Sequence, residues 1–396
     1  MKRRILLIPL VVALAVSCTP TQRVTPADDP RLTPKPTRPA VTPVPTMTPM
    51  KPTATLALTP TPIKPTATSM PTTIPVTADS LRFQAQSCDM QIGAAVAADP
   101  LRSEPLYAET LAREFNLLTP ENSMKFGPVH PDRDRYDFRD ADAIVQFAEA
   151  HRMQVRGHTL VWHNQLPAWL TDGNWARDVL IEILRDHILT VVGRYRGRVV
   201  AWDVVNEAVG DSGSLRNTIW LRVIGPEYID MAFHWAHEAD PDALLFYNDY
   251  SAEGLGQKSD AIYTLVQGLV QRGVPIHGVG LQMHTSVGAC PRHEDVATNI
   301  DRLAALGLEV HITEMDVRIR EPVTEEELDA QARIYREMLR VCVSARNCTA
   351  FVLWGFADCH SWIPDFFPGY GAGLIFDENY DPKPACDALA DVLTNP

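Results

Sequence analysis

Two glutamates each follow an apolar run of the sequence directly: Glu207 in WDVVNEA (202–208) and Glu314 in HITEMD (311–316). If both runs are strands of one sheet, the two carboxylates can face each other across a groove. Such a pair can cleave a glycosidic bond, because one group protonates the departing oxygen while the other stabilises or captures the cationic sugar carbon. We therefore expect Glu207 and Glu314 to be catalytic, with no cofactor and no metal ion.

Tryptophans suited to sugar binding occur in the same part of the chain. Trp162, Trp354 and Trp362 offer flat apolar faces on which the C–H-rich faces of sugar rings can stack. The sugar hydroxyls would need the amide, carboxylate and ammonium groups that are also found there. Trp202 and Trp235 are expected in the core instead.

Short apolar runs alternate with longer amphipathic stretches from Gln91 onward, which is typical of βα repeats with a parallel sheet. The stretches 179–192 and 325–342, for example, are apolar at three- and four-residue spacing. Eight such units close into a single α/β domain, a (β/α)8 TIM barrel. The expected strands are 91–96, 117–120, 155–161, 199–205, 244–247, 278–283, 309–313 and 350–353.

Polar side chains gather where the expected strands end. In a parallel barrel all these ends share one rim, and active sites lie at that rim. One polar strand end could be a helix cap, but their repetition favours an active site. The residues concerned are Glu121, Asn122, His158, Trp162, His163, Asn206, Glu207, Asn248, Asp249, Tyr250, Gln282, His284, Glu314, Asp316 and Trp354.

The motifs resemble glycoside hydrolase family 10, the retaining endo-1,4-β-xylanases, over roughly residues 90–390. The resemblance implies a barrel that cleaves internal β-1,4 linkages of xylan or xylo-oligosaccharides by double displacement. The matching stretches are TPENSMKF (119–126), GHTLVWHNQLPAWL (157–170), WDVVNEA, FYNDY (246–250), GVGLQMH (278–284), HITEMD, WGF (354–356) and SWIP (361–364).

By this resemblance, Glu207 is expected to be the general acid/base and Glu314 the nucleophile. Retention requires carboxyl groups about 5 to 5.5 Å apart, so the charge of Glu314 should keep Glu207 protonated until Glu314 is esterified to the sugar. Asn206 should hydrogen-bond the sugar 2-hydroxyl, and His284 should hold Glu314 ionised and correctly aimed.

The resemblance also implies a set of further sugar contacts. They are Glu121, Asn122 and Lys125 on the non-reducing side; His158, Trp162 and Gln165, supported by Gln282, in the central subsites; Trp354 and Trp362 as stacking walls; and Tyr250 on the leaving-group side.

Three alternative functions fit parts of the pattern. A metal-dependent hydrolase would bind zinc through rim histidines and would lose activity to a chelator; the candidates are His158, His163, His284, His311 and His360. A surface-tethered sugar-binding protein would have lost a catalytic carboxylate, whereas both are present. A cellulase or other β-1,4-glucanase would admit the hydroxymethyl group that glucose has and xylose lacks, which a tight wall at Trp362 would exclude.

The first 18 residues are expected to form a signal peptide. Lys2, Arg3 and Arg4 precede an apolar run, 5–16, that is short for a membrane span. The run ends in AVSC (15–18), which resembles a bacterial lipoprotein site with Cys18 as the lipidated first residue, although Leu is more usual where Ala15 stands. Membrane attachment through Cys18 or plain secretion would each place the protein outside the cell or at its surface.

Residues 19–79 are expected to be a disordered linker, because 19–78 contain 15 prolines and 17 threonines without a periodic apolar pattern. The remaining residues, 80–396, are expected to form the catalytic barrel and to act as a monomer. They carry 27 Lys or Arg against 46 Asp or Glu, a net charge of −19. That charge repels phosphate backbones, so a nucleic acid partner is not expected.

Six cysteines follow Cys18, and an even number in an exported chain predicts disulfides. We expect one between Cys342 and Cys348, which flank an expected helix-to-strand turn. Cys290 and Cys359 should both lie near the rim, where a second bridge could join two loops. Cys88 and Cys386 are unassigned.

Overall fold

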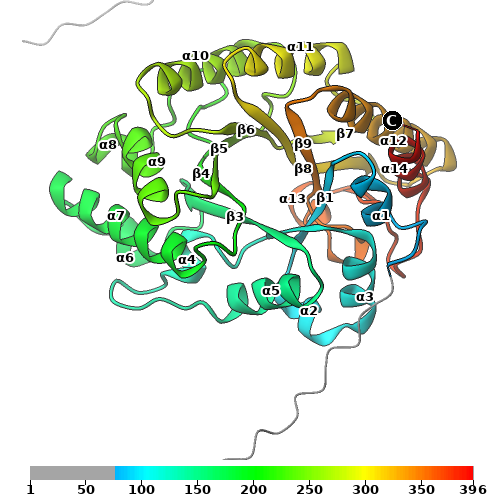
Figure 1. The fold of residues 1–396 in the computed structure, drawn as a ribbon, viewed down its shortest axis with the longest axis horizontal. Coiled ribbons are helices and arrows are strands. Elements are labelled where there is room, and N and C mark those ends of the chain that lie inside the picture. The colour runs from blue at the N-terminus through cyan, green and yellow to red at the C-terminus, as the bar shows by residue number, and fades with distance from the viewer. Residues whose placement is uncertain (1–75, 396) are drawn as a thin grey trace, which may run out of the picture. The chain divides into compact units, whose positions relative to one another are not determined.

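A closed ring of parallel strands forms the centre of the computed structural model, which describes residues 76–395 (Figure 1). The ring contains β1 (Gln91–Val96), β2 (Leu117–Pro120), β3 (Gln154–Val161), β4 (Ala201–Asn206), β5 (Leu244–Asp249), β6 (Gly278–Leu281), β8 (Glu309–Arg320) and β9 (Cys348–Leu353). β1 pairs in parallel with β2 and β9, and β8 with β6 and β9, so the ring closes. The (β/α)8 barrel expected from the sequence is confirmed. The expected signal peptide, Cys18 and most of the linker lie outside the described residues.

Helices surround the ring and connect successive strands (Figure 1). The longer ones are α3 (Pro105–Glu114), α5 (Arg139–Ala150), α7 (Arg177–Arg194), α9 (Tyr228–Ala239), α10 (Gln257–Gln271), α11 (His293–Ala304), α12 (Glu325–Ser344) and α14 (Pro384–Thr394). The expected helices 179–192 and 325–342 fall within α7 and α12. α12 begins with a capping box, in which Thr324 and Glu327 each accept the other's backbone N–H. No helix in 76–395 is long and apolar enough to cross a membrane.

Short helices occupy several of the loops that follow the strands and thereby shape the rim. They are α4 (Phe126–Val129) after β2, α6 (Ala168–Thr171) after β3, α8 (Ile219–Val223) after β4 and α13 (Ile363–Phe366) after β9. α1 (Leu81–Gln86) and α2 (Ala98–Ser103) flank β1 in the chain.

β8 continues well past position 313, where the sequence pattern placed its end. The continuation is possible because its backbone finds partners on both sides: β7 (His284–Ser286) pairs with Asp316–Arg318, and β10 (Tyr370–Gly371) pairs with Ile319 and Arg320. The extension raises Asp316 and Arg318 above the ring beside the loops that follow β6 and β9.

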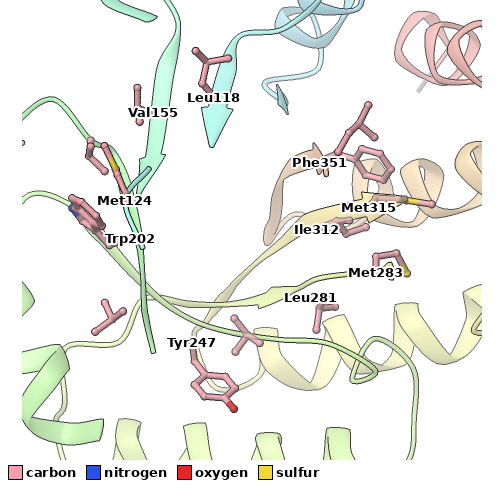
Figure 2. Close-up of a cluster of buried hydrophobic side chains, with 14 of the residues drawn as sticks. Leu118, Met124, Val155, Trp202, Tyr247, Leu281, Met283, Ile312, Met315 and Phe351 are labelled. Atoms are coloured by element: carbon pink, nitrogen blue, oxygen red, sulfur yellow. The ribbon is translucent and has the colours of Figure 1, made fainter. Parts of the chain in front are cut away.

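The main core packs between the barrel strands and the surrounding helices, as Figure 2 shows for Leu118, Trp202 and Phe351. Trp202 is fully buried and Trp235 packs against this core, as expected. Gly157 on β3 makes room for Trp202, because a Cβ at Gly157 would lie 2.2 Å from the indole ring. The glycine is therefore required by a close approach within the core.

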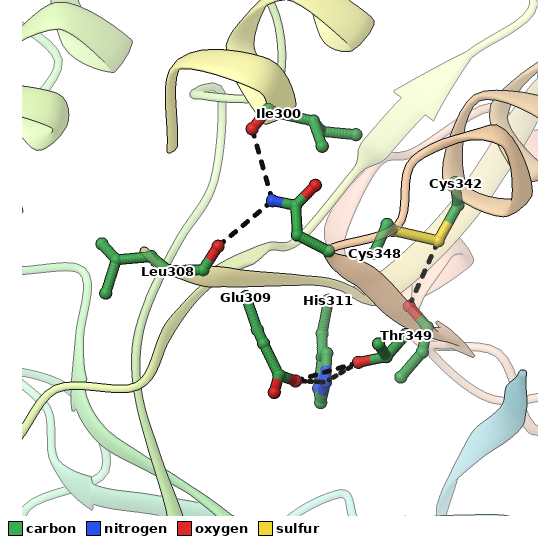
Figure 3. The surroundings of a disulfide bond; sticks show 9 residues. Ile300, Leu308, Glu309, His311, Cys342, Cys348 and Thr349 are labelled. Atoms are coloured by element: carbon green, nitrogen blue, oxygen red, sulfur yellow. Dashed lines mark hydrogen bonds and ion pairs between the residues drawn. A yellow bond between two sulfur atoms is a disulfide. The ribbon is translucent and has the colours of Figure 1, made fainter. Parts of the chain in front are cut away.

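Cys342 at the end of α12 is bonded to Cys348 at the start of β9 (Figure 3). The side-chain amide of Asn347, between them, donates to the carbonyls of Ile300 and Leu308. These contacts lie at the amino end of β9, and the polar strand ends lie at the opposite end of the barrel.

The second bridge that Cys290 and Cys359 could have formed is absent from the structure, where both residues are free thiols. Cys290 lies near Thr285 and is half-buried, whereas Cys359 is exposed beside Tyr380. The sequence placed both near the rim but could not show that separate loops hold them apart.

Candidate active site

A cleft of about 650 Å³ lies at the carboxyl ends of the barrel strands. Glu207, Glu314 and all twelve other residues expected to contact sugar line this cleft. The structure thus brings together residues from seven different strand ends. The cleft is also lined by His163, Asn164, Arg216, Ser251, Arg318, Phe366 and Phe367.

Glu314 is buried within β8, with its carboxylate at the floor of the cleft. Oε1 accepts a hydrogen bond of 2.6 Å from the Asn248 amide, and Oε2 lies 3.2 Å from Nε2 of His284. Burial opposes the charge of Glu314, but the hydrogen bond from His284 and the electrostatic effects of His158 and His284 outweigh it and lower the pKa of Glu314. Glu314 is therefore held as a carboxylate.

His284 is clamped between two carboxylates. Its Nδ1 lies 2.8 Å from Oδ2 of Asp316, opposite the contact from Nε2 to Glu314. Burial disfavours the imidazolium, but the two carboxylates more than compensate and raise the pKa of His284 to about 10. A protonated His284 donates to both. The indole N–H of Trp362 also donates to Asp316, at 2.8 Å. This bond connects the stacking wall to the three charged residues Asp316, His284 and Glu314.

Glu207 follows β4 with a left-handed backbone conformation, φ 56°. This uncommon conformation is held from both sides: the Glu207 N–H donates to the Asn248 carbonyl, and Nε of Arg216 donates to the Glu207 carbonyl. The amides of Asn206 and Gln282 both donate to Oε1, each at 3.2 Å. Oε2 accepts none of these bonds and lies 3.9 Å from Nδ1 of His163.

The Asn248 amide links the surroundings of the two glutamates. It donates to Oδ1 of Asn206 at 2.8 Å as well as to Glu314, while its own Oδ1 accepts from the Thr313 hydroxyl. Gly280 on β6 leaves room for this amide, since a Cβ there would lie 2.1 Å from Oδ1 of Asn248. The geometry of both carboxylates therefore depends on one buried side chain.

A buried ion pair supports the site from below. Asp203 on β4 pairs with Arg156 on β3, and its Oδ2 also lies 3.0 Å from Nδ1 of His158. Burial raises the pKa of Asp203, but Arg156 and His158 together lower it below its usual value. Asp203 thus fixes the imidazole of His158, whose Nδ1 lies 3.9 Å from Glu314.

Lys125 lies between the indoles of Trp162 and Trp354, with Nζ at 4.9 and 5.6 Å from their ring centroids. It donates to Oδ1 of Asn122, which also accepts from Nε2 of Gln165. Burial lowers the pKa of Lys125, against the opposing pull of nearby carboxylates. The residues expected on the non-reducing side therefore form one connected polar cluster.

Contacts with neighbouring polar side chains fix the position of Tyr250, which also lines the cleft. Its hydroxyl accepts from Arg216 and donates to Asp211, and Nζ of Lys258 lies 3.2 Å from its ring centroid. Lys258 also pairs with buried Asp249 at 2.9 Å. Burial raises the pKa of Asp249 to about 6 despite this partner.

Several positioning residues were not given a role by the sequence. Asn248 lies at the end of an expected strand, and its place in the motif FYNDY is the only feature of the sequence that marks it. Asp203 lies inside the apolar run of β4, and the sequence assigns it no role. Arg216 lies in a loop without periodicity, where nothing in the sequence marks it.

The rim histidines do not gather around a common point. Among residues 76–395, no three His, Cys, Asp or Glu side chains are arranged to hold a metal ion. His158 and His284 instead bond to Asp203 and Asp316, and His311 contacts Arg156.

A (β/α)8 barrel with two carboxylates, amides and indoles at its carboxyl-terminal rim defines a class of protein, the barrel glycoside hydrolases. The sequence model of glycosyl hydrolase family 10 matches residues 80–392. The chain belongs to this family.

Named relatives agree with this assignment. Endo-1,4-beta-xylanase B of Thermotoga neapolitana is 47% identical over 318 residues, which cover 79% of this chain and 91% of the relative. The crystal structure of native xylanase 10B from Thermotoga maritima is 48% identical, with a TM-score of 0.78, and the match covers 79% of this chain and 98% of that one. Xylanase 10B from Thermotoga petrophila RKU-1, solved in complex with xylobiose, has the same identity and TM-score and covers 79% and 97%.

Proposed function

We propose that this protein is an endo-1,4-β-xylanase that hydrolyses internal linkages of xylan with retention of anomeric configuration. The observation that carries the proposal is the contrast between two glutamates in one cleft. Glu314 is buried and held ionised by His284 and Asn248, whereas Glu207 is half-buried with one carboxyl oxygen free of hydrogen bonds from the protein. This contrast suits a nucleophile and an acid/base.

In the first half-reaction, Glu314 attacks the anomeric carbon while the bond to the leaving sugar breaks. Glu207 gives its proton to the departing oxygen, so the leaving group departs as a neutral alcohol. Because the side-chain amides of Asn206 and Gln282 donate hydrogen bonds to Oε1 of Glu207, Oε2 is the oxygen that can carry the transferred proton. The product is a glycosyl ester of Glu314 with an inverted anomeric centre.

In the second half-reaction, water attacks the same carbon and the ester bond to Glu314 breaks. Glu207, now a carboxylate, accepts the proton of the attacking water, and the second inversion restores the original configuration. Glu314 leaves as the carboxylate that His284 and Asn248 stabilise. Both catalytic groups are thereby returned to their starting state.

The choice of xylan rests on the relatives, among them a xylanase solved with xylobiose. Trp362 supports this choice because its indole is fixed by the bond to Asp316 and can crowd a hydroxymethyl group. Product analysis on xylan, carboxymethyl cellulose and mannan tests the proposal. Short oligosaccharides from xylan, released as the β-anomer, support it; turnover confined to cellulose would instead establish the glucanase alternative.

We further propose that the protein is exported and works outside the cell or at its surface. The basic and apolar pattern of 1–18, the AVSC sequence at Cys18 and the Pro/Thr-rich stretch that follows support this proposal. Expression of the full chain in a bacterial host, with fractionation and mass spectrometry of the mature N-terminus, provides the test. A lipidated Cys18 in the membrane fraction supports anchoring, an unmodified secreted chain supports plain secretion, and an intact Met1 in the cytoplasm contradicts both.

A further inference from the structure

One corner of the cleft has no part in the proposed reaction. We call it the arginine corner; it consists of Arg318, Phe366 and Phe367, which all line the cleft. Arg318 extends from the part of β8 that rises above the barrel ring, and the two phenylalanines come from the end of α13 and the residue after it. The corner is continuous with the stacking wall, because the Phe366 and Trp362 ring centroids are 5.1 Å apart.

Arg318 is held in place but is not neutralised. Its Nη1 donates to the carbonyl of Thr285 at 3.0 Å, and its guanidinium carbon lies 4.2 Å from the Phe367 ring centroid. Within 76–395 no carboxylate forms an ion pair with Arg318, although most arginines of this acidic domain have one. A guanidinium has five N–H donors in a fork that matches a carboxylate, so donors remain for a ligand.

Phe366 provides an apolar surface next to this charge. Its exposed fraction is 67%, the highest among the large hydrophobic side chains of the described residues. Its ring centroid lies 5.0 Å from that of Phe367, the same ring that the Arg318 guanidinium contacts. An exposed aromatic face at the edge of a sugar-binding cleft suits the C–H face of another pyranose ring.

We propose that the arginine corner binds a uronic acid branch of the xylan chain. The branch carboxylate would accept hydrogen bonds from the free donors of Arg318, while its ring lies against Phe366. The net charge of −19 of residues 80–396 repels an anionic branch at longer range, and the Arg318 guanidinium would offset this repulsion locally. The inference rests on the proposed function, because it assigns a branch specificity to the same cleft.

The experiment compares kcat/KM on three substrates: glucuronoxylan, neutral arabinoxylan and linear xylohexaose. Arg318→Gln should lower the value for glucuronoxylan by about tenfold and change the other two by less than about twofold. Arg320→Gln is the matched control, since Arg320 lies two residues further along β8, is exposed and does not line the cleft. It should leave all three values unchanged. Raising the salt concentration should weaken the preference of the unsubstituted enzyme for glucuronoxylan.

Phe366→Ala gives a second, independent measurement, because an exposed side chain can be removed without opening the core. It should also reduce turnover of glucuronoxylan more than that of the unbranched substrate. Equal effects of Arg318→Gln on all three substrates, or unchanged glucuronoxylan turnover in Phe366→Ala, would overturn the inference. Absence of activity of the unsubstituted enzyme on every xylan would instead overturn the proposed function.

Discussion

Nε2 of His284 lies 3.2 Å from Oε2 of Glu314, while Nδ1 of the same ring lies 2.8 Å from Asp316. The imidazolium therefore connects the proposed nucleophile to a fully buried second carboxylate. Because the pKa of His284 is raised to about 10, this contact persists across the neutral range.

Replacing His284 by Gln should move the acidic limb of the pH profile to higher pH. His284 lowers the pKa of Glu314 by stabilising its charged form, so removing the imidazolium raises that pKa and the nucleophile becomes protonated at a higher pH. We expect a shift of about one pH unit in the acidic limb of kcat/KM, with a lower maximum. The measurement is kcat/KM on an aryl xylobioside between pH 3 and 8; an unchanged acidic limb would contradict the role of His284.

Removing each glutamate separately should distinguish the two catalytic roles. Glu314→Ala should abolish hydrolysis, and added azide should attack the empty face to give an α-glycosyl azide. Glu207→Ala should retain activity on substrates whose leaving group needs no proton, and azide should intercept the glycosyl ester to give the β-azide. Identification of the azide anomers by nuclear magnetic resonance provides the readout. The opposite pairing of anomers with variants would reverse the assignment.

Gly280→Ala should impair catalysis without touching the substrate. The new Cβ would lie 2.1 Å from Oδ1 of Asn248, so the amide that binds Glu314 and Asn206 must move. We expect a destabilisation of about 1 to 3 kcal/mol and a lower kcat. Gly193→Ala in α7 is the control: its Cβ meets nothing within 4 Å, and alanine should add about 0.5 to 1 kcal/mol of stability with kcat unchanged. A Gly280→Ala enzyme with full kcat would argue against the bridging role of Asn248.

The double variant Cys342→Ala/Cys348→Ala should be less stable but equally active at 25 °C. The bridge closes a short loop with a sequence separation of 6, and loop-closure entropy predicts a loss of about 2 kcal/mol. Guanidinium unfolding of the variant and of the parent, each with and without reductant, measures the loss. The free thiols Cys88, Cys290, Cys359 and Cys386 serve as the internal control, since reductant should not affect the double variant.

The barrel could be predicted because each of its strands is a short apolar run between amphipathic helices. The ends of β8 could not be predicted in the same way. Its continuation to Arg320 depends on pairing with β7 and β10, which come from distant parts of the chain. The polar residues Glu314 and Asp316 indicate a strand end after Thr313, and only the backbone partners show that the strand continues.

Glu207, Glu314 and the twelve expected sugar contacts all line the cleft, because they follow apolar runs and match ordered motifs; other lining residues, such as Arg216 and Arg318, were not predicted. The residues that orient the cleft side chains were not predicted either. Asp203 and Asn248 lie within strands and act through other side chains, so their function depends on which strands are neighbours. Whether Cys290 pairs with Cys359 could not be predicted for a related reason: a place near the rim does not specify which loops meet.

The disulfide between α12 and β9 lies at the amino end of its strand, a full strand length from the groove where sugars would bind. The disulfide, which stabilises the fold, and the catalytic cleft therefore lie at opposite ends of the barrel. Further cross-links or tighter turns could be engineered at the amino ends of the strands, and branch preference could be varied at their carboxyl ends, with little interference between the two sets of changes.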